Sequence, residues 1–505
     1  MKGDFSRQRF NPERHYNRVL RQQGRVDLDA DWNEQAAISR HLMRTLVVDL
    51  FGRRAGPEAN CGFGLSGAPD GQKPQVGDFF IGEGRYYVDG LLVENAGTCA
   101  FTAQPEWPGA VKLTAGHSYL AYLDVWERHV TWIEDDGIRE VALGGPDTAT
   151  RVKTTWQVKV IDAGGPPKGG EAPPKDEDTK KKIAALEAKL EELVKALDAE
   201  RDAAAQAALK KQITALEREL RKLKESLGAV DPPPPPAAPA GTCGELLKPL
   251  RDWKSGRMRA RLEPSEVEET PCVLPPESRY RGLENHLYRI EVHDSGDTSV
   301  AGAAPTFKWS RENGSVAARW LGVTGATVRL SSTRGFSVDD WVEFSSEDDE
   351  LLGSPGSFAR VLSVDGDVLT VQPAPAWNPN AANPRARRWD QRANDELALV
   401  NGAVPLTAPS GEEGWIEIED GIEVQFENGQ YRSGDYWLLT ARVLTGQIDW
   451  PVNASGSATW MAPDGITHHY AELFMLESTA AAPFVSLLKD CRCKFARLAC
   501  IDDAK

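Results

Sequence analysis

The segment Thr179–Leu227 constrains the fold of this chain more than any other, because it reads as one long amphipathic stretch. Ile and Leu repeat there at alternating spacings of three and four, in two sets: Ile183, Leu186, Leu190, Leu193, Leu197 and Ile213, Leu216, Leu220, Leu223, Leu227. Such spacing places one apolar seam along a helix, as in helices that pair with other helices. We therefore expect a coiled coil, with these ten residues as its interaction surface.

Two geometries of this coiled coil remain open. The halves Lys180–Leu197 and Lys210–Leu227 are similar at an offset of 30 residues, which is not a multiple of seven, so the seam loses phase between them. A single helix would be about 74 Å long, and the absence of an internal Gly or Pro favours it. The Pro-rich flanks, Gly164–Lys175 and Asp231–Gly241, must bring the chain back, which favours a helical hairpin. The hairpin is the preferred interpretation.

The remainder of the chain reads as strands. The stretches 119–134 and 155–162 alternate aromatic or β-branched residues with polar ones, and Asp89-Gly90 between apolar runs indicates a two-residue hairpin turn. Strand-length runs at about ten-residue spacing over Trp320–Gln372 indicate a small barrel-like unit. We expect a mainly β, multi-domain protein of β-sandwich or barrel-like units with one N-terminal helix and a protruding coiled-coil insertion.

The sequence divides into five segments. They are an N-terminal helix with a β domain (1–163), the Pro-flanked coiled-coil insertion (164–241), a continuation of the first β domain (242–319), the barrel-like domain (320–376) and a C-terminal β domain (377–505).

The N-terminal helix is predicted from its capping residues. Asp31 followed three residues later by Glu34 is a capping box, so the helix should begin at Trp32 and end at Gly52. Its core-facing stripe should consist of Met43, Leu46, Val47 and Leu50.

The acidic triplet Asp27, Asp29 and Asp31 is a weak candidate for a metal site. A calcium-binding EF-hand loop would require Gly at position 32 and Glu at position 38, where this chain has Trp32 and Ile38. Helix capping is the preferred interpretation of the triplet, and no metal or cofactor is expected.

Charge and composition exclude several classes of protein. The net charge of −16 argues against a nucleic-acid-binding surface, and no apolar run is long enough to span a membrane. The opening residues do not form a signal peptide, so we expect cytoplasmic synthesis. Seven cysteines, sparse and odd in number, suit a reducing compartment. The Cys491-x-Cys493 pair with Cys500 is better interpreted as thiols than as a zinc site.

The sequence contains no recognised catalytic motif. Walker, GxSxG, HExxH and Rossmann patterns are absent, so no catalytic residues are assigned and an enzyme is not expected. Glu127 and His129 are interpreted as a polar strand face. His468 and His469 are adjacent, so in a strand they would point to opposite faces, which disfavours a metal site.

The fifteen tryptophans suggest a second kind of function. Several lie in or beside predicted strands: Trp126, Trp132, Trp320, Trp341 and Trp437. Exposed aromatic residues on sheets are used to hold sugars or protein partners. Core packing is the alternative interpretation, and it is preferred.

Long motifs resemble one bacterial family. They include YLDVWERHVTWIED, PPESRYRGLENHLYRIEVH, FKWSRENGSV and YRSGDYWLLTARVLTGQIDWP. On these the chain is similar to the domain-of-unknown-function 6519 family over nearly its whole length apart from Gly164–Gly241. The opening segment, helix and hairpin ending in YVDG are also loosely similar to baseplate-type proteins of phage tails and contractile injection systems. The family resemblance implies no catalytic residues.

Two function classes follow. The favoured one is a non-enzymatic structural or adaptor component of a phage-tail-like assembly, with protein partners or self-association, no nucleic acid and no membrane insertion. The alternative is a carbohydrate-binding or carbohydrate-active β protein that takes a glycan.

Overall fold

The computed structural model describes residues 1–505 except 9, 70, 74, 146, 165–241, 265–278, 301–303, 394–396, 407–413, 483 and 497–505. The predicted coiled coil, its ten seam residues and the choice between hairpin and single helix lie outside the described residues. The chain divides into two compact units: Met1–Ala115 with Tyr119–Ile161 and Thr242–Lys505, and Gly116–Ser118 with Asp162–Gly241. The sheet cores and pockets described below belong to the first unit.

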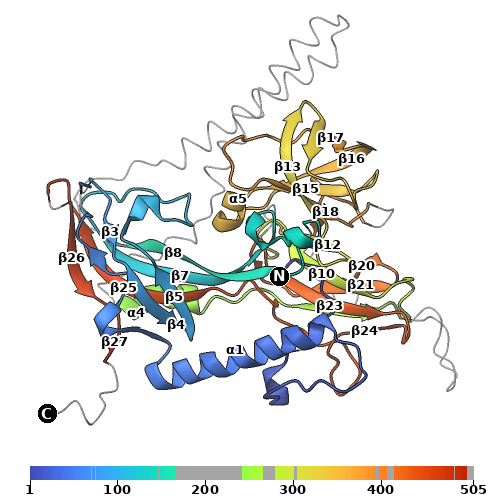
Figure 1. Cartoon of the computed structure of the whole chain (residues 1–505), viewed down its shortest axis with the longest axis horizontal. Helices are drawn as coiled ribbons and strands as arrows, with labels where there is room; N and C mark the ends of the chain where they lie inside the picture. The colour runs from blue at the N-terminus through green and yellow to red at the C-terminus, as the bar shows by residue number, and fades with distance from the viewer. Residues whose placement is uncertain are drawn as a thin grey trace, which may run out of the picture. The chain divides into compact units, whose positions relative to one another are not determined.

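The fold is mainly β, as the sequence predicts (Figure 1). Among the described residues the α-helices are α1 (Asp29–Phe51), α4 (Cys243–Arg251) and α5 (Glu347–Leu352). Single 3-10 turns are η1 (Pro12–Arg14), η2 (Glu58–Asn60), η3 (Phe101–Ala103), η4 (Asp136–Ile138) and η5 (Val141–Leu143). None of the helices in this part of the chain is long and apolar enough to cross a membrane.

The first core lies between sheets contributed by both ends of the chain. One sheet has the order β27-β1-β4-β5, another β26-β25-β7-β8, and a small third one β2-β3-β6. Their bounds are β1 (Arg54–Pro57), β2 (Leu65–Ser66), β3 (Phe80–Ile81), β4 (Gly84–Val88), β5 (Leu91–Asn95), β6 (Cys99–Ala100), β7 (His117–Val130), β8 (Arg151–Gly164), β25 (His469–Ser478), β26 (Val485–Asp490) and β27 (Lys494–Phe495). Phe63, Ile81, Val93, Leu123 and Phe474 are buried together in this core. The predicted Asp89-Gly90 turn is confirmed between β4 and β5.

A second core lies under the sheet β19-β12-β10-β23-β24, with β20-β21-β9 and β11-β22 beside it. The bounds are β9 (Met258–Leu262), β10 (His286–Val292), β11 (Gly296–Asp297), β12 (Thr306–Ser310), β19 (Val404–Pro405), β20 (Ile416–Glu419), β21 (Ile422–Phe426), β22 (Gln430–Tyr431), β23 (Tyr436–Arg442) and β24 (Gln447–Asp449). Tyr288, Phe307, Phe426 and Trp437 are fully buried here, because aromatic side chains fill the inner faces of the strands.

The expected barrel-like unit is present as a closed barrel of six strands in the order β13-β14-β17-β16-β15-β18. The strands are β13 (Ala317–Thr324), β14 (Thr327–Leu330), β15 (Trp341–Ser345), β16 (Ser357–Asp365), β17 (Val368–Gln372) and β18 (Arg385–Trp389). Closure leaves no free sheet edge, and Trp320, Val342, Phe344 and Leu369 fill the interior. The five sequence-based domain boundaries stay a prediction.

The N-terminal helix exists, but its start differs from the prediction. It begins at Asp29, with Leu28 as N-cap, and not at Trp32. Asp29 and Asp31 both lie in the first turn, where the helix dipole favours carboxylates. The Asp29 carboxylate also accepts hydrogen bonds from the Ser6 backbone nitrogen (2.9 Å) and hydroxyl (2.6 Å), a contact that the local sequence does not reveal. The predicted end is confirmed, since Gly52 follows the last helical residue with φ of 84°.

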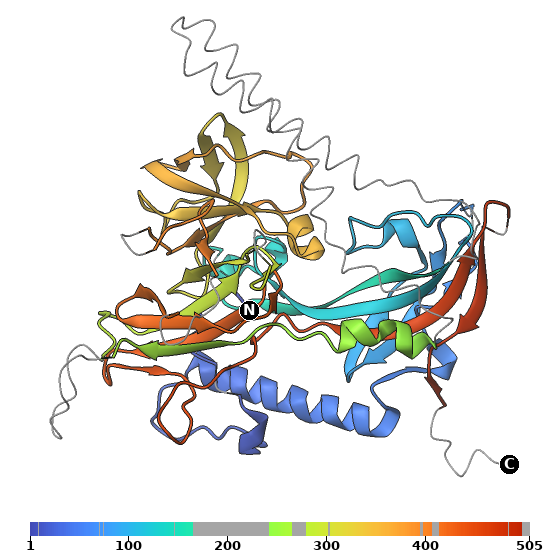
Figure 2. The same ribbon diagram turned by 180° about the vertical axis from the view of Figure 1, so that it is seen from behind.

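The predicted core-facing stripe of this helix is wrong for three of its four residues, and the fourth, Val47, is half-buried. Met43, Leu46 and Leu50 are 67%, 58% and 62% exposed, while Ala30 and Ile38 are the buried residues. Figures 1 and 2 show α1, in blue, along one side of the first unit, with the preceding residues looped beside its N-terminal half. The helix is held instead by its two buried residues, Ala30 and Ile38, and by polar contacts. One of these contacts is the hydrogen bond that Arg44 Nε donates to the Asp89 carbonyl (3.3 Å).

Candidate functional site

A pocket of about 410 Å³ lies where the first residues of the chain meet β7, β10, β12, the barrel and the segment before β25. Its lining is dominated by charged side chains. Eight are basic (Lys2, Arg40, Arg44, Arg128, Arg289, Lys308, Arg385, Arg387) and six are acidic (Glu127, Glu134, Glu291, Glu343, Glu350, Asp464). The pocket therefore has an excess of two positive side chains in a chain whose net charge is −16.

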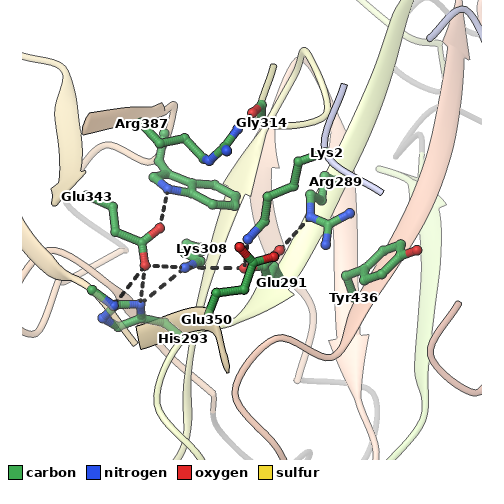
Figure 3. Close-up of polar contacts among 12 residues, drawn as sticks. Lys2, Arg289, Glu291, His293, Lys308, Gly314, Glu343, Glu350, Arg387 and Tyr436 are labelled. Atoms are coloured by element: carbon green, nitrogen blue, oxygen red, sulfur yellow. Dashed lines mark hydrogen bonds and ion pairs between the residues drawn. The ribbon is translucent and has the colours of Figure 1, made fainter. Parts of the chain in front are cut away.

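Glu291 is the centre of the ion-pair network along one wall (Figure 3). Its carboxylate is 2% exposed and lies 2.9 Å from Lys2 Nζ, 2.5 Å from Arg289 Nε and 3.3 Å from Lys308 Nζ. Burial alone would raise the pKa of Glu291, but the three cations hold it well below its usual value. Glu291 is therefore an anion inside the protein, fixed by cations from three separate segments.

Lys308 joins this wall to the barrel. Its ammonium group lies 2.6 Å from Glu343 Oε1, and Glu343 Oε2 accepts a hydrogen bond from the indole of Trp389 (2.8 Å). His293 Nδ1 lies 3.6 Å from the same carboxylate. Although burial opposes ionisation, Lys308 and His293 bring the pKa of Glu343 down to about 2. The barrel is thus tied to β10 and β12 by charge as well as by packing.

The part of the lining that comes from β7 and β18 is rich in arginine. Arg385 pairs with Glu134 and, at 2.7 Å, with Glu350. Arg387 is 6% exposed and donates a hydrogen bond to the Gly314 carbonyl, and no carboxylate of the described residues lies within ion-pair distance of it. Arg128, 4% exposed, pairs with Glu347 through Nη2, while its Nε and Nη1 are buried without a hydrogen-bond partner.

Glu127 and His129 do not form an acid–base pair. Glu127 Oε1 accepts from Arg40 Nη1 at 2.8 Å, an exposed ion pair. Burial first, and the surrounding cations second, lower the pKa of His129 to about 3, so its imidazole is neutral at pH 7. Both side chains line the pocket, but no nucleophile is hydrogen-bonded to His129 in the described part of the chain.

The side chains of the adjacent residues His468 and His469 point toward different partners, as predicted for neighbours in a strand. His468 Nδ1 lies 2.7 Å from Asp124, and His469 Nδ1 lies 2.8 Å from Asp89. His468 lines a second pocket of about 350 Å³, whereas His469 lines the charged pocket. The two imidazoles therefore do not converge on one ion.

The structure does not gather the acidic triplet into a site. Asp29 accepts from Ser6, and Asp27 lies 3.2 Å from Arg21 on the surface. Across the described ranges, no group of three or more His, Cys, Asp or Glu side chains is placed to hold a metal ion. The structure gives the triplet no metal-binding geometry.

The interpretation of Cys491 as a thiol is corrected by the structure. A disulfide joins it to Cys243, the first residue of α4, across 248 positions of sequence. Cys61, Cys99 and Cys493 are free thiols. Sequence spacing could not reveal the pairing, because it depends on α4 packing against β25.

The tryptophans are mostly part of the cores. All fifteen lie in the described residues, and only Trp32 is exposed, at 69%. Trp126, Trp320 and Trp437 are buried, and Trp132 and Trp341 are half-buried. The guanidinium groups of Arg139 and Arg319 lie 4.8 Å and 5.1 Å from the centroid of the Trp132 ring. Trp126, Trp320 and Trp437 are therefore not available at the surface to hold a sugar.

Sequence reasoning missed the charged pocket. The sequence does contain an indication of the pocket, namely charged residues inside otherwise apolar strands. Arg289 and Glu291 lie on one face of β10, and Lys308 interrupts the buried strand β12. Each of these strands is almost wholly buried, so a charge there requires a partner. Which partner it meets depends on how strands distant in sequence pair.

The fold and the site define a mainly β protein with a closed barrel and a pocket lined by ion pairs. The model of the family of unknown function DUF6519 matches residues 1–504, so the chain belongs to that family. No curated protein matches the sequence. Among solved structures, the chain is similar to one described as "Crystal structure of TssK", with 9% identity, coverage of 84% of this chain and 99% of that chain, and a TM-score of 0.17. A likeness this low carries no argument about fold or function.

Proposed function

We propose that this protein is a non-enzymatic structural or adaptor component of a phage-tail-like bacterial assembly, and that α1 provides one of its docking surfaces. The observation that carries the proposal is the exposed apolar face of α1. The kind of assembly is suggested by the loose likeness of the opening sequence to baseplate-type proteins.

The exposed face of α1 has the spacing of a pairing helix. Its solvent-facing positions follow each other at intervals of four and three: Trp32, Ala36, Ser39, Met43, Leu46 and Leu50. Leu42, which adjoins Met43, is also 51% exposed. Such a seam gains free energy when a second helix covers it, and large exposed apolar surfaces mark interaction sites.

The occupant that fits this face is a second copy of the same helix, in antiparallel orientation. The first half of α1 carries Asp29, Asp31 and Glu34, and the second half carries Arg40, Arg44 and Asp49. Both arginines pair with Glu127 of the same chain, so charge does not choose the partner, and the apolar seam does. Two copies related by a two-fold axis would place the same residues of each helix against each other. The apolar seam is self-complementary under the same operation.

The test is the oligomeric state of the full chain. Sedimentation velocity should show a dimer for the wild type, and Leu46→Glu should weaken dimerisation at least about tenfold, because a carboxylate would be buried in the seam. The melting temperature of the monomer should be little changed, since Leu46 is 58% exposed. Leu444→Glu is the matched control, because Leu444 is 98% exposed and lies outside α1.

A wild type that stays monomeric at every concentration would contradict the docking proposal, as would a dimer that Leu46→Glu leaves intact. The wider role is tested separately by whether the chain co-sediments with native particles that contain sheath and tube proteins. Recovery of such particles without this chain would contradict the assembly proposal. The glycan alternative is not taken further, because the tryptophans on which it depended are mostly buried.

A further inference from the structure

We propose that the charged pocket binds a tetrahedral oxyanion, either phosphate or the phosphoryl group of a small phosphate ester. This site differs from the exposed apolar face of α1, although Arg40 and Arg44 of that helix contribute to its lining, and it goes beyond the assembly role. It rests on the charge balance of the pocket, on buried donors that lack partners and on the shape of the groups that line it.

The charge balance favours an anion. Eight basic and six acidic side chains line the pocket, and Glu347, which is not part of the lining, pairs with Arg128. One positive charge is therefore left for a bound anion to offset. Burial lowers the pKa of Lys2 to about 8. The charges of Lys308, Arg289 and Arg387 act in the same direction, and the charge of Glu291 opposes them. A bound anion would reverse part of this depression.

The donors favour an oxyanion. Arg387 has a carbonyl partner but no carboxylate partner, and the Nε and Nη1 of Arg128 and the Nε of Arg385 are buried without acceptors. A buried N–H that makes no hydrogen bond is destabilising, so such groups are normally satisfied. The planar fork of a guanidinium group matches two oxygens of a phosphate better than a halide ion.

The size of the pocket favours an ester over the bare ion. Its volume of about 410 Å³ falls in the range of pockets for small organic ligands. The neutral imidazole of His129, which lines the same pocket and whose Nε2 lacks a partner, can accept a hydrogen bond from a hydroxyl group or donate one, depending on its tautomer.

Thermal unfolding and calorimetry of the full chain test the site. We expect inorganic phosphate and glycerol phosphate each to raise the melting temperature relative to sodium chloride at matched ionic strength. Tighter binding of the ester would identify it as the better ligand class. Arg387→Gln should weaken phosphate binding at least about tenfold, because it removes a charge-assisted donor. Arg329→Gln is the control, since Arg329 lies on the same barrel, is exposed and pairs with Asp367.

If Arg387→Gln does not fold, Arg387→Lys replaces it: the charge is kept, the fork is lost, and affinity for phosphate should still fall severalfold. The proposal is overturned if neither anion exceeds chloride in its effect on the wild type. It is also overturned if the folded Arg387 variant binds phosphate as tightly as the wild type.

Discussion

The residue that best shows how this protein handles buried charge is His293. It is 6% exposed and lies beside Lys308 and Glu343. Burial and the charge of Lys308 lower its pKa to about 4, against the opposing pull of Glu343, Asp294 and Glu291. The imidazole is therefore neutral in the folded protein at pH values at which an unfolded chain would already be protonated.

This shift predicts a direction for the pH dependence of stability. The unfolded chain takes up a proton near pH 6.5 and the folded chain only near pH 4, so stability is lost as the pH falls between these values. Glu343, whose pKa is about 2 in the fold, adds a further loss below about pH 4.5. The slope of the unfolding free energy against pH reports how many protons the chain takes up on unfolding. In His293→Gln this number should fall by up to one between pH 6.5 and 4, as measured by urea unfolding at several pH values. An unchanged slope would contradict the assignment.

At the scale of elements, the turn of the hairpin β4–β5 packs directly against the backbone of α1, and Gly90 makes this close approach possible. Gly90 has φ of +79°, a left-handed conformation, and a Cβ there would lie 2.5 Å from the Arg44 carbonyl oxygen. The turn type is readable from Asp89-Gly90, because left-handed positions favour glycine. That the turn presses on a helix is not readable from sequence.

A matched pair of substitutions separates these two effects. Gly325→Ala meets no atom within 4 Å at φ of +61°, so it should lose only about 1–2 kcal/mol for the left-handed conformation. Gly90→Ala should lose a further ~1–3 kcal/mol, because the helix backbone must move. Urea unfolding of both variants measures the difference. Equal losses would mean that α1 shifts freely from the hairpin.

At the scale of the whole molecule, the insertion should be separable from the β body. Ile161, at the end of one part of the first unit, packs against the cluster of Cys243 and Leu247, where the chain of that unit resumes. The two ends are therefore close together. A variant lacking Gly164–Gly241, rejoined by a short linker, should unfold cooperatively within a few degrees of the wild type in calorimetry. Insolubility or loss of cooperativity would contradict separability.

The sequence by itself determined what depends on local order. Strand alternation and turn residues predicted the mainly β fold, the Asp89-Gly90 hairpin and the barrel-like unit, because side-chain period and turn conformation are properties of adjacent residues. The existence of a helix ending at Gly52 followed from the same local rules. The absence of a catalytic motif was likewise a local observation.

The tertiary structure decided what depends on contacts between distant residues. The helix α1 has apolar residues on more than one side, so only packing could choose Ile38 as buried and leave Met43, Leu46 and Leu50 exposed. Asp29, the first residue of α1, accepts hydrogen bonds from Ser6, a contact between segments that are separated in the sequence. The charged pocket required Lys2, Glu291, Lys308 and Arg387 to meet from separate segments, and a charge in a strand specifies that a partner is needed without specifying which one.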